Sequence, residues 1–157
     1  MIETALKYRS MGLAVVPQKY NQKHPFVAWS EFQERLPTEK EVRTWWTDNP
    51  DAGISSVVGS VSRIVVVDCD SQESVERFEL QIPDSIIVPT AQTPRGGRHY
   101  YFSSDKAYKK CVAIEPKTDF QAEKSIIMLP PSKGKNGSSY SWLIEPTCFE
   151  DFPSIKY

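Results

Sequence analysis

The sequence predicts an α+β fold, in which a mixed, largely antiparallel sheet is covered by packed helices. Two observations lead to this prediction. Apolar runs rich in β-branched and aromatic residues, which are typical of strands, recur along the chain between short helical patterns. These patterns do not follow the regular spacing of the βαβ units that build a parallel sheet. With 157 residues, 39% hydrophobic and 25% charged, the chain fits one soluble domain, residues 1–157.

The chain opens with a short predicted helix followed by a short predicted strand. Residues 2–11 carry a partial apolar face, and Gly12 can end this helix. Residues 13–16 are apolar and predict a buried strand. We expect Pro17 to stop it, since proline has no N–H to donate to a ladder.

The clearest helical signal covers residues 38–46. Thr38 and Glu41 have the spacing of a capping box, which fixes the start of the helix. One side of this helix is an apolar stripe, and we expect it to pack in the core rather than to stack nucleic-acid bases. The stripe consists of Val42, Trp45 and Trp46.

The middle of the chain predicts two strands and a helix. Residues 53–58 and 64–68 read as strands, and Gly59 between them suggests that they form a hairpin. Ser71 can then cap a helix that runs to about residue 80.

The second half of the chain is predicted to be rich in strands. Residues 106–117 are polar and irregular, and we expect no strand there. Because side chains alternate along a strand, His99 and Tyr101 are expected to share one face. The predicted strands are 86–92, 98–102, 118–120, 125–129 and 140–144.

Charge and cysteine content restrict the function and the compartment. The formal net charge of −1 gives no overall basic field, so nucleic-acid binding requires a local patch or another domain. No apolar run is long enough to span a membrane, and no secretory signal is present. The three cysteines are widely spaced, with no CxxC pair, which indicates a reducing compartment. We therefore expect a cytoplasmic protein with no membrane contact.

Two carboxylates end the most apolar predicted strand. Residues 64–67 form a β-branched run, followed by Asp68, Cys69 and Asp70. Alternation places Asp68 and Asp70 on one face and Cys69 on the other. Two close carboxylates repel each other unless a cation neutralises them, and Mg²⁺ favours carboxylate and phosphate oxygens. The alternative is a polar turn in which Asp70 caps the next helix.

A glycine pair precedes a cluster of basic residues. Gly96 and Gly97 allow a ligand to approach the backbone closely, and Arg95, Arg98 and His99 can meet phosphate oxygens there. The alternative is a tight hairpin with solvated arginines and a packed histidine. A second cluster with a hydroxyl and basic groups follows Pro130-Pro131. Its members are Ser132, Lys133 and Lys135.

Four motifs taken together resemble a known family. They are Val-Val-Val-Asp-Cys-Asp, Thr-Pro-Arg-Gly-Gly-Arg-His-Tyr-Tyr-Phe, Thr-Asp-Phe-Gln and Ile-Ile-Met-Leu-Pro-Pro-Ser, in this order. The pattern resembles the prim-pol domain, a bifunctional DNA primase/polymerase of the archaeo-eukaryotic primase superfamily. The resemblance runs from the first helix to Trp142. It implies a catalytic core like the RNA-recognition motif, and a small N-terminal α/β unit of about residues 1–50.

The resemblance also implies site residues for a nucleotidyl transfer with two Mg²⁺ or Mn²⁺ ions. The family's acidic residues fall on Asp68, Asp70 and Asp119, with Glu115 and Glu123 as competitors for the third position. The family's histidine falls on His99, which would bind the triphosphate. Gln121 stands where the family often has an arginine. This difference implies reduced activity or the loss of one phosphate contact. Candidate phosphate ligands are Arg95, Arg98, Ser132 and Lys133.

The partners implied are nucleoside triphosphates, ribo- or deoxyribo-, and a single-stranded DNA template. The family context suggests replication of a plasmid, phage or mobile element, together with C-terminal helical and helicase domains or subunits. We expect this chain to hold single-stranded DNA weakly, with Lys106, Lys109 and Lys110 as one possible edge for a strand. Two alternatives stay open: a single-stranded nucleic-acid-binding module without catalysis, and a metal-dependent nuclease.

Overall fold

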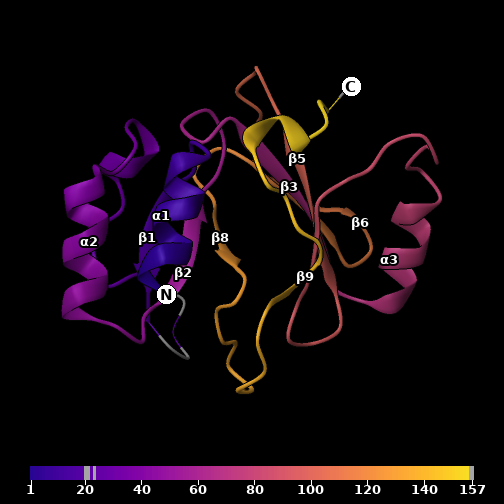
Figure 1. Cartoon of the computed structure of the whole chain (residues 1–157). Coiled ribbons are helices and arrows are strands. Elements are labelled where there is room, and N and C mark those ends of the chain that lie inside the picture. Colours follow the sequence, from indigo (N-terminus) through magenta and orange to yellow (C-terminus); the bar gives the residue numbers. More distant parts are fainter. Residues whose placement is uncertain (20–21, 23, 156–157) are drawn as a thin grey trace.

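A computed structural model describes residues 1–19, 22 and 24–155 and confirms the α+β class. Within these residues α1 and α2 pack beside a small sheet, and a large sheet separates this part of the molecule from α3 (Figure 1). No helix in this part of the chain is long and apolar enough to cross a membrane. The elements are α1 (Ile2–Ser10), β1 (Ala14–Gln18), η1 (Glu31–Gln33), α2 (Glu39–Asp48), β2 (Gly53–Val57), β3 (Ile64–Cys69), α3 (Gln72–Glu79), β4 (Thr90–Gln92), β5 (Arg98–Ser103), β6 (Cys111–Glu115), β7 (Thr118–Gln121), β8 (Ile126–Leu129), β9 (Ser141–Ile144) and η2 (Phe149–Asp151).

The small sheet has the strand order β1-β2-β8, and both pairings are antiparallel. Its strands come from three distant parts of the chain, so residues 1–50 supply only part of it. Contrary to expectation, Pro17 does not stop β1: it is the Cα partner of Ile54, and β1 continues to Gln18. Proline is accepted here because β1 is an edge strand with one partner strand in the sheet.

The large sheet has the order β6-β7-β3-β5-β4-β9, and the pairings between its strands are antiparallel. The predicted hairpin between β2 and β3 is wrong. The chain turns at Gly59, with φ of 96°, and a single bridge joins Gly59 to Ile64. The two strands then enter different sheets, because β1 and β8 already occupy both edges of β2, and β5 and β7 both edges of β3.

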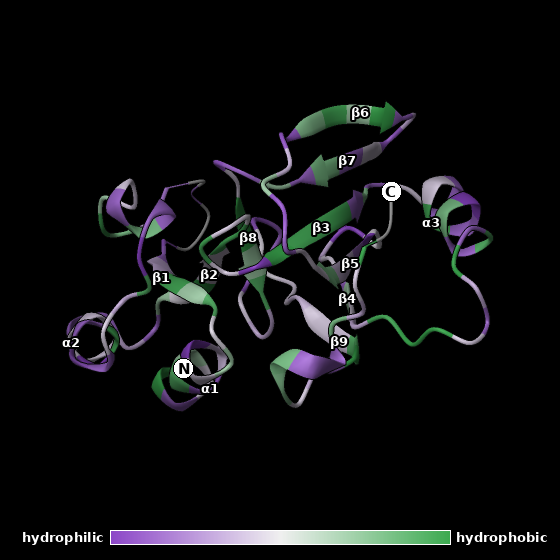
Figure 2. Ribbon diagram, turned by 90° about the horizontal axis from the view of Figure 1, so that it is seen from above, coloured by the Kyte–Doolittle hydropathy of each residue, from purple (hydrophilic) through white to green (hydrophobic). Residues whose placement is uncertain are grey.

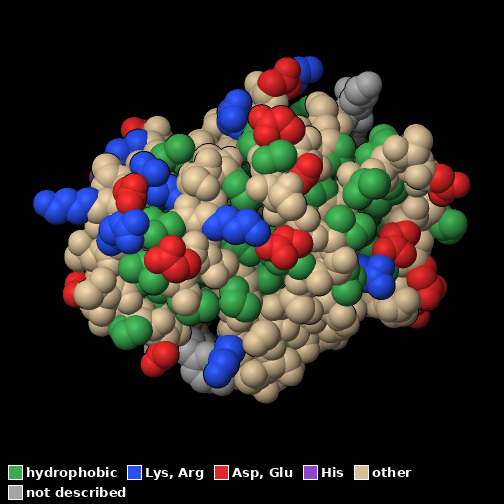
Figure 3. Space-filling view, viewed as in Figure 1, with side chains coloured by type: hydrophobic (Ala, Val, Ile, Leu, Met, Phe, Trp, Pro, Cys, Tyr) green, Lys and Arg blue, Asp and Glu red, His purple; other side chains and the backbone are tan. Residues whose placement is uncertain are grey.

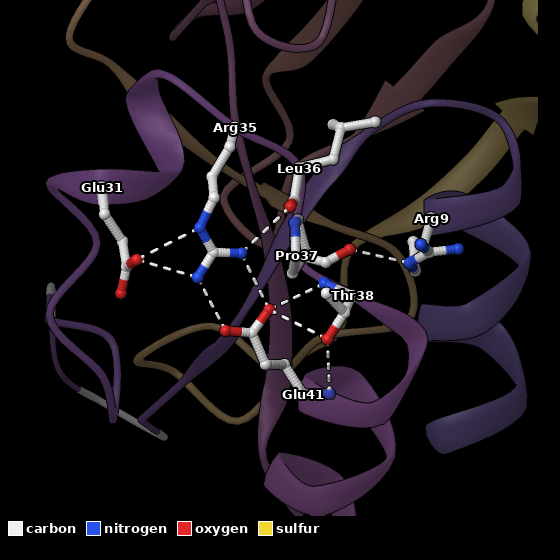
Figure 4. A network of polar contacts seen from close by, with 7 residues as sticks. All are labelled: Arg9, Glu31, Arg35, Leu36, Pro37, Thr38 and Glu41. Atoms are coloured by element: carbon white, nitrogen blue, oxygen red, sulfur yellow. Dashed lines mark hydrogen bonds and ion pairs between the residues drawn. The ribbon is translucent and has the colours of Figure 1, made fainter.

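The helices begin where the sequence predicts. Thr38 caps α2 in a reciprocal capping box with Glu41, and Ser71 caps α3 with Ser74. Figure 4 shows that Glu41 also forms an ion pair with Arg35, at 2.7 Å. Because Thr38 and Arg35 both bind this carboxylate, the start of α2 is tied to the preceding η1 segment.

Two hydrophobic cores lie on the two faces of the large sheet. One core lies between the sheets and includes Val66, Tyr101 and residues of α1 and α2. The other lies between the sheet and α3 and includes Val67 and Tyr100. Figure 2 shows the hydrophobic strand β3 between β7 and β5 at the centre of this arrangement. Alternate residues of β3 therefore serve different cores, as expected for a strand buried on both faces.

Most later strands match the prediction, with two differences. Residues 98–102, 118–120, 125–129 and 140–144 correspond to β5, β7, β8 and β9. Residues 86–89, however, are not a strand, and Ile87 is 74% exposed. Cys111–Glu115, expected to be irregular, forms the edge strand β6. An exposed edge strand buries little apolar surface, so it produces no alternating pattern in the sequence.

Candidate active site

Three predicted site residues form a row across the middle of the large sheet. Asp68 on β3 is the Cα partner of Asp119 on β7 and of His99 on β5. Directly opposed residues project from the same face of a sheet, here the face toward the small sheet, which also carries Val66 and Tyr101. Cys69 projects from the other face and packs in the core beneath α3, as alternation predicts.

Asp70 follows the end of β3 and is held from both sides. Its N–H donates to the carbonyl of Lys117 at 2.9 Å. On the other side, Gly97 lies so close that an ideal Cβ there would be 3.2 Å from Cα of Asp70. Partial burial raises the pKa of Asp70, and the charges of Asp68 and Asp119 raise it further. The three predicted acidic residues are therefore electrostatic neighbours.

Asp68 and His99 are in close contact in a buried setting. Oδ1 of Asp68 lies 3.2 Å from Nε2 of His99, and the two side chains are 18% and 6% exposed. This contact is not a hydrogen bond, and no described residue donates one to Oδ1, which is a buried acceptor. Nδ1 of His99 faces the hydroxyl of Tyr101 at 3.5 Å. A buried carboxylate oxygen left unpaired is costly and is typical of a site that binds a ligand.

The register supports Asp119 over its two competitors as the third acidic residue. Glu115 forms an ion pair with Arg77 of α3, at 2.7 Å. Glu123 accepts hydrogen bonds from the N–H and hydroxyl of Ser60, both at 2.5 Å. Both glutamates are thus engaged elsewhere, whereas Asp119 lies beside Asp68.

The carboxylates are suitable ligands for a hard divalent cation. Their side chains, however, are not arranged to coordinate one. Carboxylate oxygens are the preferred ligands of Mg²⁺, and Oδ1 of Asp68 accepts no hydrogen bond from the described residues. Within the described residues, however, no group of three or more His, Cys, Asp or Glu side chains is close enough to hold a metal ion. Oδ1 of Asp119 accepts a hydrogen bond from the N–H of Ala113 at 2.7 Å.

Comparison with family models gives one match, which covers nearly the whole chain. Residues 5–155 match the family model described as Prim-Pol, bifunctional DNA primase/polymerase, N-terminal. The chain belongs to the Prim-Pol family. Among proteins with curated descriptions, no sequence matches it. Family membership indicates a primase/polymerase type of nucleotidyl transfer.

Arg95 and Arg98, two basic residues predicted for the Prim-Pol site, lie on different sides of the large sheet. Arg95 is exposed in the turn before β5, and its charge acts on the nearby Tyr140. Arg98 projects from the opposite face of β5, where it pairs with Glu79 of α3. Tyr100 on the same face donates to Glu79 at 2.9 Å. The structure therefore brings Arg95, but not Arg98, to the carboxylate side of the sheet.

Ser132 and Lys133 lie beside the small sheet. The hydroxyl of Ser132 is fully buried; it accepts from the N–H of Ile54 at 2.7 Å and donates to the carbonyl of Ile54 at 3.0 Å. Lys133 lines a hollow of about 570 Å³, together with Lys19 and with the small-sheet residues Gln18, Gly53 and Met128. The phosphate contacts predicted for these two residues stay predictions, and the hydroxyl of Ser132 is already occupied by Ile54.

The glycine pair has a structural role in this site. Gly96 has φ of 88°, which completes the turn before β5. Gly97 is buried, and a Cβ there would overlap the carbonyl oxygen of Cys69. The pair thus lets the turn pack directly against the chain that carries Asp70. The same turn is fixed to the loop after β8, because the side-chain amide of Asn136 donates to the carbonyl of Pro94 at 2.9 Å.

Tyr140 is a site residue that the sequence reasoning missed. Its ring lies 5.6 Å from the ring of His99, and its pKa is raised by burial and then by the charges of Asp68 and Asp70. The available signal was alternation. Trp142, two residues later, projects into the core between the sheets, so Tyr140 belongs to the same face.

Proposed function

We propose that this domain catalyses template-directed nucleotidyl transfer from nucleoside triphosphates to a DNA or RNA primer. The observation that carries the proposal is the row of Asp119, Asp68 and His99 on one sheet face, with Asp70 beside it, in a chain of the Prim-Pol family. In this reaction the primer 3′-oxygen bonds to the α-phosphorus. The bond from that phosphorus to the bridging oxygen breaks, and pyrophosphate leaves.

The three aspartates would hold Mg²⁺ or Mn²⁺. Such ions lower the pKa of the attacking hydroxyl and stabilise the charge of the leaving pyrophosphate. The role of the protein is to fix the carboxylates on rigid strands. Asp68 lies on the central strand β3, and its neighbours β5 and β7 support the site on both sides. Rigid placement of the backbone that carries Asp68 limits reorganisation to the side chains.

His99 and Arg95 are proposed to bind the phosphates of the incoming nucleotide. His99 is presented on the same face as the carboxylates, and Arg95 lies at the same end of the sheet. A histidine N–H and a guanidinium both donate charge-assisted hydrogen bonds to phosphate oxygens. Together they would hold the end of the triphosphate while the carboxylates act near its reacting phosphorus.

We also propose how this chain depends on other domains to bind the template. The visible face in Figure 3 has acidic and basic side chains interspersed, and the net charge is −1. Since affinity for nucleic acid depends largely on neutralised phosphates, we propose that this chain alone binds single-stranded DNA weakly. Efficient priming would then need additional helical or helicase parts, as in replication of a plasmid, phage or mobile element.

The test is incubation of the purified chain with a 5′-labelled primer on a template, Mg²⁺ or Mn²⁺, and either rNTPs or dNTPs. We expect stepwise primer extension with release of pyrophosphate, which is absent with EDTA and in Asp70→Asn. Shortening of the primer without nucleotide use would indicate a nuclease instead. Metal-independent DNA binding with neither product would indicate a binding module, and either outcome would overturn the proposal.

A further inference from the structure

Tyr140 lies at the reaction end of the sheet, on the face that carries His99. It directly precedes β9, and its N–H donates to the carbonyl of Ser132 at 2.8 Å. That hydrogen bond fixes the backbone of Tyr140 between the loop after β8 and the large sheet. Tyr140 is half-buried, so part of the residue remains accessible to solvent.

The ring of Tyr140 forms one side of the His99 environment. The two rings are 5.6 Å apart between centroids and inclined by 41°. The ring of Tyr101 lies 6.3 Å from the imidazole, at 66°. His99 is thus enclosed by two tyrosine rings and by Asp68, and Tyr140 is the one of these two tyrosines that reaches the surface.

The hydroxyl of Tyr140 lies among the charges of the site. Burial raises its pKa, the charges of Asp68 and Asp70 raise it further, and the charge of Arg95 lowers it. Tyr101, by comparison, is completely buried and faces His99. Among the described residues no side chain forms a hydrogen bond with the Tyr140 hydroxyl. A half-buried phenol O–H without a protein partner can donate to a bound ligand.

From this placement we propose that Tyr140 is a nucleotide-binding residue, whose ring holds the His99 imidazole in position and whose hydroxyl donates a hydrogen bond to a phosphate oxygen of the bound nucleotide. The neighbourhood of His99, the acidic residues and Arg95 favours phosphate over base or sugar, because phosphate is the group that metal-bearing carboxylates and a guanidinium both attract. The inference rests on the proposed function, since it assumes that a nucleotide binds beside Asp70.

The test compares Tyr140→Phe, which keeps the ring, with Tyr140→Leu, which removes it. The dissociation constant of dATP is measured by titration calorimetry with Mg²⁺, and deoxyadenosine serves as a probe without phosphate. A hydrogen bond to a charged group predicts about tenfold weaker dATP binding for Tyr140→Phe. Tyr140→Leu should be weaker still, and binding of deoxyadenosine should be the same in Tyr140→Phe and wild type.

Two measurements separate this role from a merely structural one. The chain has two histidines, so the imidazole NMR signals of His99 can be compared with those of the exposed His24 as an internal reference. Tyr140→Leu should shift only the His99 signals, and Tyr140→Phe should leave both nearly unchanged. The matched control is Tyr8→Phe, which removes a hydroxyl bonded to the carbonyl of Pro130 at 2.7 Å. It should lower stability without changing dATP affinity.

The outcomes distinguish the inference from the proposed function. If wild type does not bind dATP with Mg²⁺, the proposed function fails. If wild type binds dATP and Asp70→Asn weakens binding, while both Tyr140 variants bind normally, the role of Tyr140 alone is wrong. If Tyr140→Phe weakens dATP and deoxyadenosine equally, the contact is with the base or sugar, and the phosphate contact is overturned.

Discussion

The carbonyl oxygen of Cys69 occupies the space where a side chain on Gly97 would begin. This contact joins the turn before β5 to the chain segment that carries Asp70. We predict that Gly97→Ala destabilises the fold by about 1–3 kcal/mol, as overpacking does. It should also displace Asp70 and reduce primer extension strongly. Thermal unfolding and a primer-extension assay measure the two effects.

Gly96→Ala is the matched control for this prediction. Gly96 has φ of 88° but open space around its missing Cβ. Its substitution should therefore cost about 1–2 kcal/mol of backbone strain. Extension activity should stay close to wild type at a temperature where both variants are folded. Equal loss of activity in the two variants would contradict the positioning role of Gly97.

Asp68→Asn should abolish nucleotide addition without unfolding the protein. The variant removes a buried charge whose Oδ1 accepts no hydrogen bond from the described part of the chain, so the midpoint of thermal unfolding should be unchanged or higher. Activity should fall at least about a hundredfold, since metal-bound charge stabilisation is worth several kcal/mol. Asp48→Asn, at the exposed end of α2, is the control with the same chemical change. An active, folded Asp68→Asn would exclude Asp68 from the reaction.

The carboxylate of Glu41 predicts a defined dependence of stability on pH. Hydrogen bonds from Arg35 and then from Thr38 lower the pKa of Glu41 from 4.5 to about 2. The stabilisation is present above the unfolded pKa of 4.5 and is lost as the pH falls toward 2. Glu41→Gln should cost about 1 kcal/mol at pH 7, after allowance for screening at the surface. The difference from wild type should vanish near pH 2.

Thermal unfolding from pH 2 to pH 7 measures this effect. Glu39→Gln is the control because Glu39 forms an exposed pair with Arg43, at i,i+4 in the same helix. Such a pair contributes only about 0.3–0.5 kcal/mol. A Glu41→Gln penalty that persists unchanged at pH 2 would show that the charge is not responsible.

Ser132→Ala tests whether this hydroxyl serves the fold or the phosphates. The variant leaves the buried N–H of Ile54 without its hydrogen bond, which should cost about 1–3 kcal/mol. If the fold is its only role, the affinity for dATP should be unchanged. Ser138→Ala, an exposed serine in the same loop, should change neither quantity. A large loss of dATP affinity at unchanged stability would favour the phosphate contact predicted from the sequence.

Much of the fold could be predicted because local signals agreed with the final packing. The capping residues Thr38 and Ser71 mark the starts of α2 and α3, and the β-branched run of β3 indicates a strand buried on both faces. The pairing of β2 could not be predicted. The short connection at Gly59 favoured a hairpin, but the partners of β2 are β1 and β8, which lie far away in the sequence.

The site was predictable to the extent that its residues are carried by regular strands. Asp68 and His99 oppose each other on the paired strands β3 and β5. The sequence pattern predicted both strands and the side-chain alternation along each of them. Arg98 was predicted as a phosphate ligand together with its neighbour His99, but alternation along β5 places it on the other face, with Tyr100 beneath α3. Tyr140 could be placed on the face of Trp142 by alternation, but the sequence does not reveal that β9 pairs with β4, which brings this face next to His99.

The small sheet also sets an order of events during protein synthesis. Its central strand β2 has been made by residue 57, but its partner β8 ends only at residue 129. The ribosome must therefore produce β3, β5 and β7 of the large sheet before the small sheet can be completed. Until then, the nascent chain exposes an unpaired edge of β2, a surface that other chains can bind. A ribosome that stalls between these residues would release a fragment prone to aggregation.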